Sequence, residues 1–120
     1  MNKLFKSILH LIKPVKKNPV PLPYVEFRST ISPKAVLIDV RSKEEFDSGH
    51  IYTAIHLDFN ASDFSQKIKQ LKKKHRLFLL YSNRSKRSVE AGQLMVKKGF
   101  RKVFYLEGGL SEWTGNLILT

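Results

Sequence analysis

The chain has 120 residues, 42% of them hydrophobic and 27% charged, a composition typical of one globular domain and not of a disordered chain. Its net charge of +12 favours anionic partners: nucleic acid, lipid surfaces or small anions. It contains no cysteine, which excludes disulfides, thiolate metal sites and thiol catalysis as the sequence stands. No motif calls for a cofactor or a metal, and no apolar run approaches the roughly 20 residues that cross a bilayer.

Residues 1–13 have the pattern of a basic amphipathic helix that ends at Pro14. Its apolar positions, at helical spacing, are Met1, Leu4, Phe5, Ile8, Leu11 and Ile12. Such a helix can lie in the interface of an anionic membrane, or it can pack on its own domain. The first alternative predicts a cytoplasmic protein held peripherally at the inner face of the membrane. Residues 14–23 hold four of the five prolines and are predicted to be an extended tether.

The folded domain is predicted to span residues 24–120, with strands and helices in alternation. A continuous apolar run at 35–40 is too short for a helix and is typical of a buried parallel strand. Ser42 and Glu45 form a capping box for the next helix. The predicted strands span residues 35–40, 55–57, 76–81 and 103–106. The predicted helices are a helical turn over 25–31, a helix over 43–48, a helix that Asn60 caps, a helix over 86–98 and a short helix that carries Trp113. This alternation indicates a parallel α/β sheet.

The third strand leads into the candidate site, a basic loop between an apolar run and a helical pattern. The loop comprises Ser82, Asn83, Arg84, Ser85, Lys86 and Arg87. Ligands of parallel α/β sheets bind beyond the carboxyl ends of the strands, where this loop is predicted to lie. Backbone amides at a helix N-terminus, with about three positive charges, would hold a small anion such as thiosulfate, sulfate or phosphate.

Four groups of residues in this order resemble the single-domain rhodanese (thiosulfate sulfurtransferase) family. They are Leu37–Arg41 with Glu44–Phe46, Gly49–Ile51, Tyr81 with its loop, and Leu106–Gly109 with Trp113. The resemblance implies a five-stranded parallel sheet flanked by helices and a six-residue loop that begins at a nucleophilic cysteine and ends at an arginine. In that family the cysteine takes a sulfane sulfur as a persulfide and passes it to a thiophilic acceptor.

Ser82 stands at the position of the family's cysteine and Arg87 at that of its arginine. An alcohol cannot form a persulfide, so sulfur transfer is predicted to be absent. The chain is then expected to act as a binding or regulatory module, with an anion in its loop and an unknown protein partner. The alternative is an active sulfurtransferase whose cysteine was exchanged for serine by design. Ser85 stands where the family usually has glycine, and a positive φ there would cost serine roughly 1–2 kcal/mol.

Two other functions are disfavoured. A serine hydrolase would need a histidine base beside Ser82, and no G-x-S-x-G elbow surrounds that serine. A nucleic-acid binder would interleave aromatics with its basic patch, and the basic run at 72–74 has none beside it. The resemblance and turn chemistry give structural roles to the remaining motif residues, which are Asp39, Arg41, His50, Glu107, Gly108 and Gly109.

Overall fold

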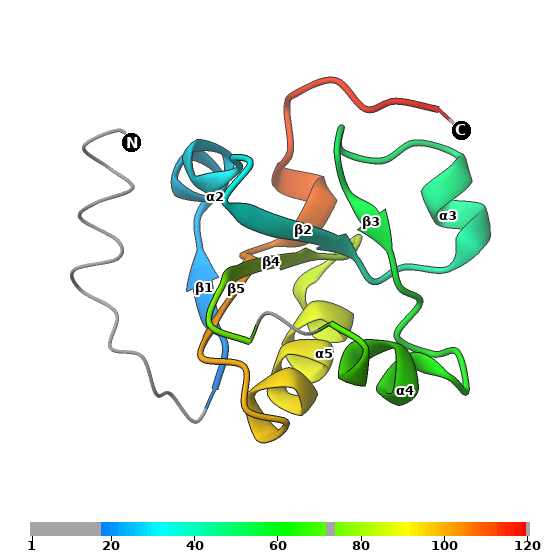
Figure 1. The fold of residues 1–120 in the computed structure, drawn as a ribbon. Coiled ribbons are helices and arrows are strands. Elements are labelled where there is room, and N and C mark those ends of the chain that lie inside the picture. The colour runs from blue at the N-terminus through cyan, green and yellow to red at the C-terminus, as the bar shows by residue number, and fades with distance from the viewer. Residues whose placement is uncertain (1–17, 72–73, 120) are drawn as a thin grey trace.

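A computed structural model describes residues 18–71 and 74–119, so the predicted helix over 1–13 lies outside the described residues. The sheet has five strands in the order β1-β5-β4-β2-β3, and every adjacent pair is parallel (Figure 1). The strands are β1 (Val20–Leu22), β2 (Ala35–Asp39), β3 (Ile55–His56), β4 (Leu77–Tyr81) and β5 (Lys102–Leu106). The helices are α2 (Tyr24–Thr30), α3 (Lys43–Asp47), α4 (Phe64–Lys69), α5 (Ser85–Lys97) and the 3-10 helix η1 (Gly109–Glu112).

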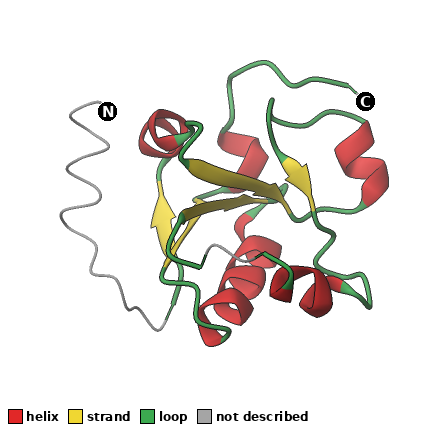
Figure 2. Cartoon of the chain, viewed as in Figure 1, coloured by secondary structure: helices red, strands yellow, loops and turns green. Residues whose placement is uncertain are grey.

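Helices cover both faces of this sheet (Figure 2). On one face, α4 and α5 contribute Ile68 and Met95 to a core with Phe78 and Leu80 of β4. On the other face, Phe27 of α2 packs in a second core that includes further residues of β2, β4 and β5. All five residues of β4 are buried, as a central strand covered on both sides requires. The predicted class, a five-stranded parallel α/β sheet flanked by helices, is confirmed.

The end of the predicted tether belongs to the sheet. Residues 14–23 were predicted to be an extended tether, yet Val20–Leu22 forms β1 and pairs with β5. Proline is tolerated there because β1 is an edge strand with one neighbour, so Pro21 does not have to donate a hydrogen bond on its outer side. The sheet therefore begins at Val20 and not after Pro23.

The start of α4 differs most from the prediction, and the starts of α2 and α5 differ by one residue each. Asn60 was predicted to cap the helix that follows, but α4 begins at Phe64 after Asp63, and Asn60 lies in a turn where its N–H donates to Asp58 (2.8 Å). Helix α5 begins at Ser85, one residue earlier than predicted. The capping box of α3 is confirmed, since Ser42 Oγ accepts from the Glu45 N–H (3.2 Å). In the described ranges no helix has the length and apolarity to cross a membrane.

Candidate functional site

The basic loop lies at the carboxyl end of β4, where the apolar strand stops and α5 begins. An open depression of about 270 Å³ is lined there by Asn83, Arg84, Lys86 and Arg87. The predicted location is therefore observed, but the six residues divide into a short turn and the first turn of α5, because Ser85 is already helical.

Ser82 is fully buried, and its hydroxyl is engaged by its own loop. The hydroxyl donates to the backbone carbonyl of Arg84 and accepts from the Ser88 N–H (3.3 Å). The Ser88 hydroxyl lies 3.4 Å away. The Ser82 proton is therefore engaged by a backbone carbonyl, and none of its partners in the described chain is a base that could take this proton.

The histidines near this edge of the sheet make other contacts. Nδ1 of His50 lies 3.1 Å from the Ile51 carbonyl oxygen, and the His50 ring stacks on that of Phe46 with centroids 3.8 Å apart. His56 Nε2 lies 2.7 Å from the Arg41 carbonyl. Both imidazoles thus contact the chain between β2 and β3. In the part of the chain that the structure describes, no cluster of three His, Asp or Glu side chains could hold a metal ion.

Arg87 is held by Glu45, a contact that the sequence did not indicate. The guanidinium donates to both carboxylate oxygens of Glu45, at 2.8 and 3.0 Å. This hydrogen-bonded pair, helped by the Ser42 N–H, lowers the pKa of Glu45 from 4.5 to about 2 and raises the pKa of Arg87. Asn83 also donates to Glu45 through Nδ2. Of the three loop cations predicted to face an anion, Arg87 therefore has its charge balanced within the protein.

Arg84 and Lys86 are the cations that remain for a ligand. Both are exposed, and neither has a carboxylate partner among the described residues. The backbone N–H groups of Ser85, Lys86 and Arg87 open α5 and have no acceptor in the described chain. The local arrangement of two cations beside free helix amides suits an oxyanion.

Asp39 and Arg41 form a buried ion pair beneath the loop. The Arg41 side chain is 5% exposed, and its Nη2 lies 2.7 Å from Asp39 Oδ2. The same guanidinium donates to the Gly49 carbonyl (2.6 Å) and to Asn83 Oδ1 (3.1 Å). Arg41 therefore ties the ends of β2 and α3 to the loop. Tyr81 lies nearby, and burial raises the pKa of its phenol.

The two glycines after β5 support the loop from the other side. Gly108 and Gly109 have φ values of 81° and 69°, as the turn prediction required. A Cβ at Gly109 would lie 2.4 Å from the Asn83 carbonyl oxygen, so only glycine allows this approach. The Leu110 N–H donates to the Ser82 carbonyl (2.9 Å), whereas the Glu107 side chain is exposed.

Ser85 adopts an ordinary helical backbone, so the conformational penalty considered from the sequence does not arise. Thr53 is the one non-glycine residue with positive φ in residues 18–71 and 74–119. The Ser85 hydroxyl accepts from the Gly108 N–H (2.8 Å) and so joins the start of α5 to the glycine turn. A serine side chain at this position therefore contributes a contact that glycine could not make.

Glu45 is the site residue that sequence reasoning missed. It was interpreted only as the partner of Ser42 in the capping box, a role that it does fill. That role directs its carboxylate toward the N-terminus of α3, which follows the carboxyl end of β2, so proximity to the loop after β4 was foreseeable. The pairing with Arg87 could not be foreseen, because Glu45 and Arg87 are 42 positions apart in the sequence.

These features define an α/β domain with a parallel sheet and a polar loop at its carboxyl edge. The rhodanese-like domain family matches residues 25–116, and the chain belongs to that family, as its motifs predicted.

The chain is 35% identical over 92 residues to the uncharacterized protein YqhL of Bacillus subtilis, covering 77% of this chain and 70% of that protein. It is 34% identical over 79 residues to the thiosulfate sulfurtransferase GlpE of Coxiella burnetii, covering 65% of this chain and 70% of that protein. The crystal structure of the Alr3790 protein from Anabaena is similar in fold, with a TM-score of 0.73 and 23% identity over 82% of this chain and 91% of that one.

Proposed function

We propose that this rhodanese-like domain does not transfer sulfur and acts as a binding or regulatory module with an oxyanion in its loop. The carrying observation is Ser82, which stands at the nucleophile position of the family in a chain without cysteine. Sulfur transfer needs a thiolate that attacks a sulfane sulfur and forms a persulfide as the S–S bond of the donor breaks, and an alcohol cannot form a persulfide. The burial of Ser82 and its bond to the Arg84 carbonyl also argue against its use as an oxygen nucleophile.

The oxyanion part of the proposal is supported by the charges at the loop. Arg84 and Lys86 line one depression at the start of α5, and the charge of thiosulfate, sulfate or phosphate suits it. Because Arg87 is paired with Glu45, binding is expected to be weak at neutral pH. Calorimetric titration with phosphate should show binding by the full chain that Arg84→Gln together with Lys86→Gln abolishes.

Sulfur transfer is tested by the thiosulfate:cyanide assay on three chains: the protein itself, Ser82→Cys and, as the matched control, Ser82→Ala. The protein and the alanine variant are expected to form no thiocyanate. Turnover by the protein itself would overturn the proposal. The cysteine variant reports on the scaffold, because activity would show that only the thiol is missing.

The second candidate is a sulfurtransferase whose cysteine was exchanged for serine by design. It is favoured by the intact support of the loop, namely the Asp39–Arg41 pair and the glycine turn. An active Ser82→Cys variant would agree with it. The genomic codon at position 82 then decides, because a serine codon there excludes an exchange by design.

A further inference from the structure

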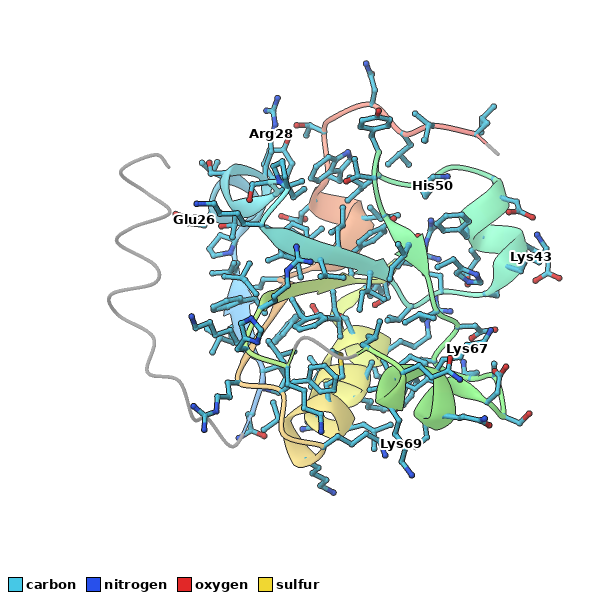
Figure 3. All side chains as sticks on the ribbon, viewed as in Figure 1. Glu26, Arg28, Lys43, His50, Lys67 and Lys69 are labelled. Atoms are coloured by element: carbon cyan, nitrogen blue, oxygen red, sulfur yellow. The ribbon has the colours of Figure 1, made fainter. Side chains whose placement is uncertain are left out.

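The layer that covers one face of the sheet carries an unusual excess of positive charge. Residues 64–106 contain 13 of the chain's 22 lysines and arginines but one of its ten acids, Glu90. This segment makes α4, β4, α5 and β5. Since the two strands are mostly buried, most of the charge must reside on the helices and their connections. Figure 3 shows Lys67 and Lys69 on α4, on the side of the sheet away from Arg28 and Lys43.

A basic surface lies where the C-terminal end of α5 meets the segment that leads into β4. We define it by Lys74, Lys97, Lys98 and Arg101. All but Lys98 are exposed, and in the described ranges none of the four pairs with a carboxylate. The Arg101 N–H donates to the Lys74 carbonyl (3.3 Å), and Lys74 Nζ lies 5.7 Å from the centre of the Phe100 ring. These contacts bring the segments 74–75 and 97–101 together.

The N-terminal part of the chain joins the domain at this same layer. Pro19 is buried against α5, and a Cβ at Gly92 would lie 2.7 Å from the Pro19 Cβ. The sequence before Asn18 has five lysines, no acid and the amphipathic pattern of residues 1–13.

From this positive charge and the amphipathic pattern of residues 1–13 we propose that the basic surface docks on a bilayer of anionic lipid. Each lysine or arginine near such a surface contributes attraction, and an apolar stripe adds burial in the headgroup region. Nucleic acid fits less well, because the aromatic rings of the α4 and α5 layer, such as Phe64 and Phe100, are buried and cannot stack on bases. The inference does not depend on the chemistry of Ser82.

The docked orientation leaves the loop accessible. The basic surface lies at the C-terminal end of α5 and the loop at its N-terminal end. The 13 residues of this helix span about 20 Å at 1.5 Å per residue. Arg84 and Lys86 would therefore face the aqueous side while the domain is on the membrane.

The test is sedimentation of the full chain with phosphatidylcholine vesicles, with and without phosphatidylglycerol. Lys97→Gln with Arg101→Gln removes two charges from the basic surface, and Arg28→Gln with Lys43→Gln removes two exposed charges from the side of the sheet away from α4. We expect the first double variant to lower partitioning onto anionic vesicles about 30-fold, because each charge contributes about 1 kcal/mol. The control double variant should lower partitioning less than about 3-fold. Equal urea midpoints establish that both double variants fold. If Lys97→Gln with Arg101→Gln does not fold, Lys97→Gln alone replaces it, with an expected loss of partitioning of about 5-fold.

Three results would overturn the proposal. One is equal loss of binding by the two double variants, since it would mean that net charge and not this surface drives association. Another is equal binding to vesicles with and without phosphatidylglycerol. The third is tighter binding to a single-stranded RNA than to anionic vesicles in the same buffer, which would identify nucleic acid as the partner.

Discussion

Two arginine–carboxylate pairs at the carboxyl edge of the sheet have the same chemistry and different surroundings. The side chains of Arg41 and Asp39 are 5% and 0% exposed, and Arg41 Nη2 lies 2.7 Å from Asp39 Oδ2. Arg87 and Glu45 are 26% and 31% exposed, and they lie 2.8 Å apart. A buried charge that loses its partner is costly, whereas one at the surface can take up water or another ion. The inner pair is therefore structural, and we expect that the outer pair can exchange its carboxylate for a ligand.

The largest expected effect is at the inner pair. Arg41→Met leaves the fully buried Asp39 without a counter-ion and removes the bonds to Gly49 and Asn83. We expect the free energy of unfolding to fall by about 3–5 kcal/mol, measured by urea titration. The control is Lys43→Gln, which breaks an exposed pair with Asp47 and should give no measurable change. Comparable stabilities of the two variants would contradict the structural role of Arg41.

The glycine turn is expected to be the next most sensitive position. Gly109→Ala combines a φ of 69° with a Cβ that would contact the Asn83 carbonyl. We expect a loss of about 2–4 kcal/mol in the free energy of unfolding. Gly99→Ala is the matched control, because it also has positive φ but meets only the flexible Lys74 side chain. Equal losses would show that backbone strain alone matters and that the close approach does not.

The outer pair should have a smaller effect and a distinctive pH dependence. The pKa of Glu45 is about 2 in the folded protein and near 4.5 when unpaired. The pair therefore stabilises above about pH 4.5, and this stabilisation is lost as the pH falls toward 2. After solvent screening we expect Glu45→Gln to cost about 1–2 kcal/mol at pH 7 and nothing near pH 2. A pH-independent effect would contradict the assignment.

The same substitution tests whether the outer pair can open. Without the Glu45 carboxylate, Arg87 is free to join Arg84 and Lys86 around an anion. Phosphate should then bind several-fold more tightly to Glu45→Gln than to the protein at pH 7, as measured by calorimetry. Unchanged affinity would mean that Arg87 does not contribute to the anion site.

The smallest effect is expected at the centre of the loop. Ser82→Ala removes a hydroxyl that links the Arg84 carbonyl to the Ser88 N–H. We expect a loss of about 1 kcal/mol in the free energy of unfolding, measured by urea titration, since two backbone groups lose one partner each. A loss as large as that of Arg41→Met would mean that the loop depends on Ser82 more than its contacts indicate.

The sequence alone predicted most of the strands and helices and the place of the loop, because these follow from local patterns. Apolar runs bounded by turn residues indicated the four strands β2 to β5, and the capping box at Ser42 set the start of α3. The edge strand β1 was missed because the prolines in and around it favour an extended tether when only neighbouring residues are considered. Its pairing with β5 depends on residues more than 80 positions away.

At the site, the sequence determined that no thiol is present, and the tertiary structure decided which of the loop cations lack a carboxylate partner. The absence of cysteine and the serine at position 82 exclude a persulfide whatever the fold. Which of the loop cations is free depends on Glu45, which reaches Arg87 only because β2 and β4 are neighbours in the sheet. An ion pair between residues 42 positions apart forms through the packing of these strands, and no periodicity in the sequence encodes it.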